Sequence, residues 1–222
     1  MEITMNVKTL RQAVMDELAY DPSIRSEHIA VTAVNGVVTL LGHVPRYLDK
    51  VDAEHAASRV AGVRGVANDI VVKLPEELKE SDEVIASRAL QSLAWDSAVP
   101  KNQIQVHVSS GCVTLTGKVE WGFQRLAAEN NVRKLHGVVT VANQIVVQPR
   151  RVPPNTQNIR QQILDALRRN LMEHTAVDVK ADGSRVILTG HVSDYAQRRV
   201  AERVAWSAAG VEQVQDNLAV IA

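Results

Sequence analysis

The chain has 222 residues, and its 25 basic and 25 acidic side chains give a formal charge of zero. Hydrophobic residues make up 45% and charged residues 23%, which is typical of a globular protein and excludes a long disordered chain. There is no three-residue glycine period and no sustained heptad, which excludes collagen-like and coiled-coil arrays. Aromatic residues reach only 3%, so the core has to be built from Val, Ile, Leu and Ala.

Cysteine content and the N-terminal sequence bear on chemistry and location. Cys112 is the one cysteine, which excludes an intrachain disulfide and a cysteine-based metal site, and we expect it to be a small buried strand residue. Residues 1–8 lack the pattern of a signal peptide, and no run of 18 apolar residues occurs. We therefore expect a cytoplasmic protein, or a periplasmic one if a leader has been removed.

Three blocks of sequence recur at the same offsets, 75 residues from the first copy to the second and 73 from the second to the third. The first block is rich in Val, Thr and Leu between two glycines, and it reads GVVTLLGHV at 36–44, GCVTLTGKV at 111–119 and GSRVILTGHV at 183–192. The others are an Ala-Glu pair and a segment such as AGVRGVANDI at 61–70. Because all share the offsets, we infer three copies of one unit of about 70 residues.

Each unit opens with a helical pattern, in which apolar residues recur every four positions and so share one helix face. These residues are Leu10, Val14 and Leu18, then Ile85, Ala89 and Leu93, then Ile159, Ile163 and Leu167. Ser81 and either Asn155 or Thr156 are the expected N-caps of the second and third copies.

Two strands follow the helix, joined by a tight turn at Asn35-Gly36, at Ser110-Gly111 and at Asp182-Gly183. Asn-Gly and Asp-Gly supply the positive φ angles that tight hairpins require. A second helix then runs to Gly62, Gly137 or Gly210, and an alternating strand ends the unit.

The predicted fold class is therefore α+β, with three tandem small domains at 6–74, 81–149 and 155–222. Each domain is αββαβ, and its three-stranded mixed sheet packs against two helices. Proline-containing connectors at 75–80 and 150–154 separate them. Because one sheet face of so small a unit stays uncovered, we expect packing through sheet faces or edges, on a neighbouring copy or on another chain.

The repeated motif resembles the BON (bacterial osmotically inducible and nodulation) domain family, and the resemblance covers nearly the whole chain. In the first copy the matching residues are Gly36, Val38, Leu40, Gly42, Ala53, Glu54, Gly62, Val63, Val66 and Asn68, and the second copy repeats them. The third departs, with Gln215-Asp216-Asn217 in place of the Ala-Asn pair. Most of these residues have a sufficient structural explanation, and we expect Asn68 and Asn143 to hydrogen-bond locally in a turn.

The resemblance implies a link to envelope stress and binding of phospholipid. The residues themselves show no His-x-x-x-His, phosphate loop or nucleophile motif, so we predict a protein that is not an enzyme and has no metal and no cofactor. We expect a stress-related protein that associates with anionic phospholipid headgroups at a membrane surface.

Aromatic and basic residues where each second helix begins are the candidate lipid or anion site. Aromatic rings beside cations suit a membrane interface, and guanidinium groups bind phosphate in bidentate fashion. From residue 150 onward, which includes the second connector, the chain carries ten basic residues, nine of them Arg, against eight acidic ones. The candidates are Tyr47, Lys118, Trp121, Phe123, Arg125, Tyr195, Arg198, Arg199 and Arg203.

Alternatives to this interpretation remain open. The aromatic residues at these turns can instead pack against a neighbouring copy, and the basic ones can form a solvated face. The net charge of the third copy is too small for us to expect nucleic acid as a partner. A structural scaffold or homo-oligomer is a second hypothesis, because unpaired strands template association. A sensor of a small ion or ligand between the repeats is a third.

Overall fold

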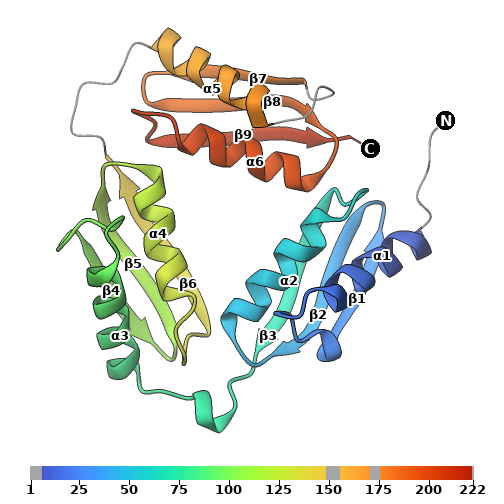
Figure 1. The fold of residues 1–222 in the computed structure, drawn as a ribbon, viewed down its shortest axis with the longest axis vertical. Coiled ribbons are helices and arrows are strands. Elements are labelled where there is room, and N and C mark those ends of the chain that lie inside the picture. Colours follow the sequence, from blue (N-terminus) through green and yellow to red (C-terminus); the bar gives the residue numbers. More distant parts are fainter. Residues whose placement is uncertain (1–6, 149–155, 171–175, 222) are drawn as a thin grey trace.

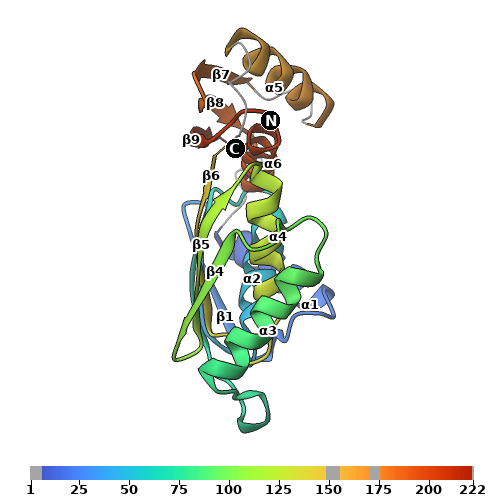
Figure 2. The same cartoon turned by 90° about the vertical axis from the view of Figure 1, so that its left-hand side faces the viewer.

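The computed structural model describes residues 7–148, 156–170 and 176–221, and in these ranges it forms three similar units. The second connector and Asn155 lie outside the described residues. Figure 1 shows the units around a common centre, and Figure 2 shows that their sheets line one side of the molecule and their helices the other. The predicted α+β class with three mixed sheets is confirmed.

Domain 1 comprises α1 (Val7–Tyr20), the short 3-10 helix η1 (Ser26–His28), β1 (Ile29–Val34), β2 (Val37–Val44), α2 (Tyr47–Arg59) and β3 (Gly65–Val72). The 3-10 helix η2 (Glu76–Leu78) follows in the first connector. Domain 2 comprises α3 (Asp82–Trp95), β4 (Ile104–Ser109), β5 (Cys112–Val119), α4 (Gly122–Val132) and β6 (Thr140–Val147). Domain 3 comprises α5 (Thr156–Asn170), β7 (Ala176–Asp182), β8 (Arg185–Val192), α6 (Tyr195–Trp206) and β9 (Gln213–Val220).

In each sheet the second strand of the hairpin is central. It pairs antiparallel with the strand before it and parallel with the strand after it, which returns through the second helix. The hairpins close as the dipeptides predict in two copies, because Asn35 and Gly36 have φ of 51° and 80°, and Ser110 and Gly111 have φ of 52° and 73°. In the third hairpin, only Gly183 has positive φ.

The cores are aliphatic, as the composition requires. The predicted faces of the first helices are all buried, from Leu10, Val14 and Leu18 in α1 to Ile159, Ile163 and Leu167 in α5. No aromatic residue is among the fully buried core residues of the described ranges. Cys112, in contrast, is exposed, so the expectation of a buried cysteine is wrong. It lies on the outward face of β5, opposite the helices.

An asparagine in the last strand fastens the second helix to the sheet in two domains. The Asn143 side chain donates to the carbonyl of Arg125 at 3.1 Å and to Glu129 at 2.9 Å, and it accepts from the Ile145 amide at 3.2 Å. Asn68 makes the equivalent bonds in domain 1. These residues therefore lie in strands and clamp a helix, and the expectation of a turn is wrong.

Domain 3 replaces this clamp with an ion pair. Asp216, at the position of the asparagine, accepts from Nε of Arg198 at 2.7 Å and from the Leu218 amide at 2.9 Å. The sequence departure in the third copy thus preserves the attachment of α6 to β9 through different chemistry.

Candidate functional site between the three domains

The second helices α2, α4 and α6 face one another at the centre of Figure 1. The first residue of α2, Tyr47, packs on the core of domain 2, and the first residue of α6, Tyr195, packs on the core of domain 1. At the equivalent place in α4 stands Gly122, and here Trp206 from the end of α6 fills the contact. The domains therefore close into a ring, each touching both others.

These contacts combine apolar burial with hydrogen bonding. Burial raises the pKa of the Tyr47 hydroxyl, and hydrogen bonds to the Val141 backbone and the Thr140 side chain of β6 oppose this effect in part. The Tyr195 amide donates to the carbonyl of Val63 at 3.2 Å. Both rings are half-buried between domains.

Trp206 joins domains 2 and 3. Its half-buried ring packs against the cores of both. A Cβ on Gly122 would lie 2.7 Å from the carbonyl oxygen of Trp206, so the two backbones meet without room for a side chain. The Arg125 guanidinium carbon lies 5.5 Å from the centre of the Trp206 ring, which is within cation–π range.

The domains do not stack through their sheets (Figures 1 and 2), so within this chain the expectation of packing through sheet faces is wrong. The edge strand β6 does contribute, through its contact with Tyr47. Helix ends carry the rest because their residues point toward the centre, whereas the uncovered sheet faces point outward.

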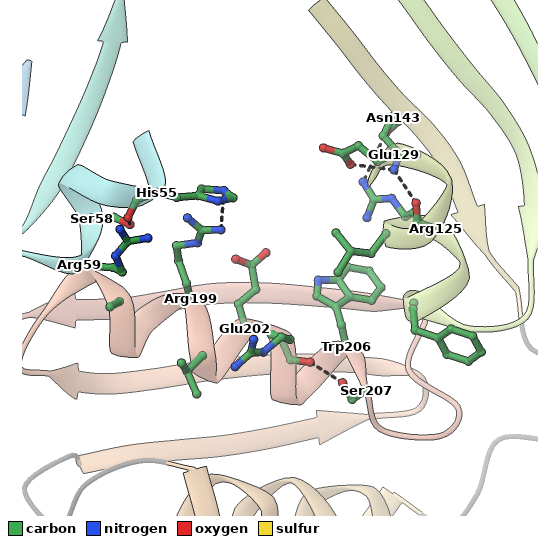
Figure 3. A pocket seen from close by; sticks show the side chains of 16 residues that line it. His55, Ser58, Arg59, Arg125, Glu129, Asn143, Arg199, Glu202, Trp206 and Ser207 are labelled. Atoms are coloured by element: carbon green, nitrogen blue, oxygen red, sulfur yellow. Dashed lines mark hydrogen bonds between the residues drawn. The ribbon is translucent and has the colours of Figure 1, made fainter. Parts of the chain in front are cut away.

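A cavity of about 710 Å³ lies where the three helices meet (Figure 3). Domain 1 contributes His55, Ser58 and Arg59, and α6 of domain 3 forms one whole wall. The residues of domain 2 come from α4 and β6, and they are Gly122, Phe123, Arg125, Leu126, Glu129 and Asn143. The cavity is therefore shared by all three copies.

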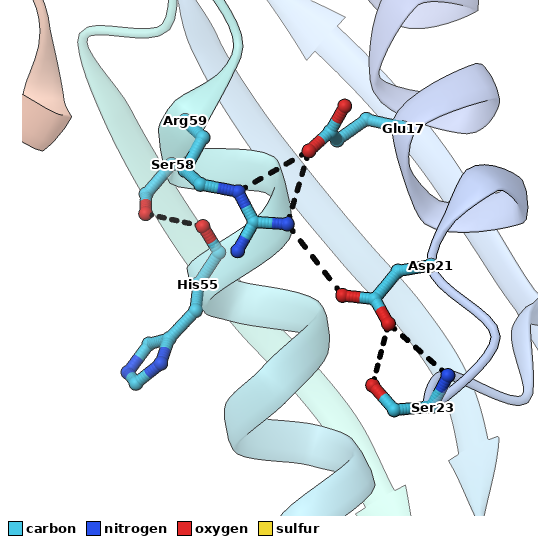
Figure 4. Close-up of polar contacts among 6 residues, drawn as sticks. All are labelled: Glu17, Asp21, Ser23, His55, Ser58 and Arg59. Carbon is cyan, nitrogen blue, oxygen red and sulfur yellow. Dashed lines mark hydrogen bonds and ion pairs between the residues drawn. The ribbon is translucent and has the colours of Figure 1, made fainter.

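Arginine dominates the charge of the cavity. Arg59, Arg125, Arg199 and Arg203 line it, against the carboxylates of Glu129 and Glu202. Arg59 is held within its own domain, because it donates to Glu17 at 3.0 Å and lies 3.6 Å from Asp21 (Figure 4). The Arg203 side chain has no hydrogen bond or ion pair with any residue that the structure describes.

His55 and Arg199 form a contact across the boundary of domains 1 and 3, with 2.8 Å between Nε2 and Nη2 (Figure 3). A guanidinium group only donates, so Nε2 accepts and the proton of the neutral ring is on Nδ1. Burial, together with Arg199, Arg133 and Arg59, lowers the pKa of His55 to about 4. The ring is therefore neutral at pH 7 and adds no charge to the cavity.

The structure brings four of the nine predicted site residues together in this cavity, namely Phe123, Arg125, Arg199 and Arg203. Tyr47 and Tyr195 lie instead in the contacts between domains, and Arg198 pairs with Asp216. Trp121 and Lys118 are exposed but do not line the cavity. A role in binding stays a prediction for all nine residues.

Sequence reasoning missed several cavity residues, namely His55, Arg59 and Trp206. Trp206 had a usable signal, because the equivalent positions in the other copies hold Ser58 and Arg133. It also missed two aromatic residues at the ends of the first helices, Tyr20 and Trp95, which are 85% and 83% exposed and stand at equivalent positions in copies one and two.

The ring fold and its shared cavity define a tandem-repeat protein of three small α+β domains. The BON domain family model matches residues 6–73, 81–149 and 155–222, and the chain belongs to this family. Over 145 residues it is 28% identical to Osmotically-inducible protein Y of Escherichia coli (strain K12). The aligned region covers 64% of this chain and 72% of that protein.

Two solved structures of CdsD, a structural protein of the type III secretion system of Chlamydia trachomatis, also match. They share 15% and 14% identity with this chain. The first match covers 95% of this chain and 91% of the solved chain, and the second, a structure of the C-terminal domain, covers 100% of each chain. The TM-score is 0.27 in both cases, so they carry no argument about arrangement or function.

Two negative findings concern residues 7–148, 156–170 and 176–221. None of the helices there is long and apolar enough to span a bilayer. No group of three or more His, Cys, Asp or Glu side chains in those residues is arranged to hold a metal ion.

Proposed function

We propose that this chain is a non-catalytic, stress-related protein that binds anionic phospholipid surfaces peripherally and reversibly. Its BON domains and its similarity to an osmotically inducible protein support the link to osmotic stress. The side chains around the cavity support anionic lipid as the partner.

One observation carries the proposal: exposed apolar side chains stand next to arginines at the edge of the central cavity. Phe123 and Leu126 are 54% and 47% exposed, and both line the cavity together with Arg125 and Arg203. Apolar groups that enter the headgroup layer and cations that meet lipid phosphates reinforce each other at an anionic surface.

Vesicle flotation tests this function. We expect the chain to float with vesicles of phosphatidylcholine and phosphatidylglycerol but not with phosphatidylcholine alone, and we expect high salt to weaken the binding. Phe123→Ala and Arg199→Ala should each weaken binding by roughly three- to tenfold.

The matched control is Arg168→Gln. Arg168 is an exposed arginine on α5 that does not line the cavity, and among the described residues its ion pair is with Asp165 on its own helix. This variant should bind like the parent. Equal binding to neutral vesicles, or unchanged binding of both Phe123→Ala and Arg199→Ala, would refute the proposal.

A homo-oligomeric scaffold is the second candidate, and the outer sheet face of domain 1 favours it. Val34, Val37, Leu41 and Val71 lie on this face and are 39% to 64% exposed. We propose a second copy of the chain as the occupant. Light scattering should then show a dimer that Val37→Lys dissociates, and a monomer at all concentrations would contradict it.

The cytoplasmic location expected from the sequence stays a prediction. Fractionation of cells, with the chain followed by an antibody, tests it directly.

A further inference from the structure

Two arginines of the central cavity keep donors that the described residues do not satisfy, although Nη2 of Arg125 donates to the Asn143 carbonyl at 3.3 Å. Arg203 has no polar partner among the described residues, and the buried Nε of Arg125 likewise has no hydrogen-bond acceptor there. Leaving a buried donor unpaired costs free energy, so such a nitrogen in a cavity indicates a site for an acceptor. Both residues line the same cavity.

We propose that this cavity binds one phosphate monoanion, carried by a lipid headgroup or free in solution, and that the bound phosphate links the domains. The proposal deepens the membrane-binding function and rests on it for the lipid source. Binding of free phosphate requires no membrane.

The balance of charge fits a monoanion. Arg59 pairs with Glu17 and Asp21, which do not line the cavity, and the other charged lining residues are Arg125, Arg199 and Arg203 against Glu129 and Glu202. His55 is neutral, because its Nε2 accepts from Arg199. These five side chains sum to one positive charge, which balances the single negative charge of a phosphodiester or of dihydrogen phosphate.

The three arginines reach the cavity from two different domains. Arg199 and Arg203 stand four residues apart on α6, so they share one helix face, and Arg125 approaches from α4 of another domain. The planar guanidinium fork binds phosphate oxygens in pairs, which a lysine does not do. A phosphate that contacts Arg125 and Arg203 connects domain 2 to domain 3, and Arg199 extends the connection to His55 of domain 1.

Trp206 provides the readout, because it lines the cavity and Arg125 stacks on it. The chain has three tryptophans, so replacing Trp95 and Trp121 by Phe leaves Trp206 as the only one. We expect a saturable change in its fluorescence, and a rise in melting temperature, when inorganic phosphate is titrated at constant ionic strength against chloride.

Arg203→Gln should weaken this binding by roughly tenfold or more, because a hydrogen bond to a charged group is lost. Arg168→Gln in the same background is the control and should bind like the parent. A second titration uses dihexanoyl phosphatidylglycerol below its micellar concentration, with glycerol as the blank.

Saturation by phosphate supports a free-anion source, and saturation by the short-chain lipid alone supports the headgroup source. Failure of both ligands, or equal affinity of Arg203→Gln and the parent, overturns the proposal. If phosphate saturates the site but vesicle flotation fails, only the membrane function falls. If flotation succeeds while neither soluble ligand binds, only the cavity site falls.

Discussion

Acidification should destabilise the contact between domains 1 and 3 through a single imidazole, that of His55. Its Nε2 accepts from Arg199 at 2.8 Å, and Arg133 and Arg59 add further positive charge around the ring. A proton on Nε2 removes the acceptor and places a cation beside these guanidinium groups. Protonation of His55 is therefore unfavourable in the folded chain. Unfolding or separation of the domains removes the repulsion between the imidazolium and the guanidinium groups.

The sign and size of the effect follow from the pKa of His55, which falls from 6.5 to about 4 in the folded chain. Above pH 6.5 both states are neutral, and stability is complete. As the pH falls from 6.5 toward 4, the unfolded state takes up a proton that the folded state does not, so stability declines. The full shift corresponds to ~3 kcal/mol, and because solvent screens the half-buried ring we expect roughly 1–2 kcal/mol.

The assay is urea unfolding of the parent and of His55→Gln at several pH values from 7.5 to 4.5. Glutamine keeps an oxygen that accepts from Arg199 but does not titrate. The parent should lose roughly 1–2 kcal/mol more than the variant over this interval. Asp21 and Asp96, whose pKa values are lowered by hydrogen bonds, act at lower pH and equally in both proteins. Identical pH dependence of the two proteins would refute the reasoning.

Three other substitutions test the packing. Gly122→Ala should lower the free energy of unfolding by about 1–3 kcal/mol, because the added Cβ meets the Trp206 carbonyl oxygen. The fluorescence of Trp206 should shift as well. The control is Gly65→Ala, whose Cβ meets no atom closer than 4.0 Å and should leave that fluorescence unchanged. Asn143→Ala removes three hydrogen bonds and should cost about 1–3 kcal/mol in urea unfolding, so an unchanged midpoint would contradict the clamp. The Asp82 carboxylate accepts from two amides of the β4–β5 turn, and these hydrogen bonds lower its pKa. Asp82→Asn should therefore lower the melting temperature at pH 7. This difference between parent and variant should shrink below pH 3.8, where the carboxylate of the parent becomes protonated.

Local patterns were sufficient to predict the fold of each copy. Four-residue apolar spacing identified the buried face of α1, and Asn35-Gly36 and Ser110-Gly111 identified the hairpins, because these features depend on neighbours in sequence. Ser81 is the N-cap of α3 as predicted, since its hydroxyl accepts from the Val84 amide at 3.3 Å. Each of these signals is complete within a few residues.

The arrangement of the copies was not predictable in the same way. Tyr47 and Tyr195 are the first residues of their helices, where a side chain is commonly exposed. The sequence pattern does not indicate whether such a ring contacts lipid or a neighbouring domain. Trp121 and Phe123 are only neighbours of the position equivalent to the two tyrosines, which is Gly122, so they do not make the same contact. His55 was missed because its partner, Arg199, is 144 residues away.

The three contacts of the ring solve one packing problem in two ways. Domains 1 and 3 each offer a tyrosine at the start of the second helix, and the receiving domains hold Arg133 and Ser58 at the position equivalent to Trp206. Between domains 2 and 3 the large and small residues exchange places, since Gly122 supplies the space and Trp206 the ring.

This exchange also explains why the cavity has a distinct wall. Where a third tyrosine would stand, Gly122 leaves Arg125 free to stack on Trp206, and the first turn of α4 exposes Phe123 beside it. The ring is therefore least symmetric at the boundary of domains 2 and 3, where the unpartnered nitrogens of Arg125 and Arg203 lie. The arginine lining thus depends on positions at which the copies differ, since the residues equivalent to Arg203 are His55 and Asn130 in the other two copies.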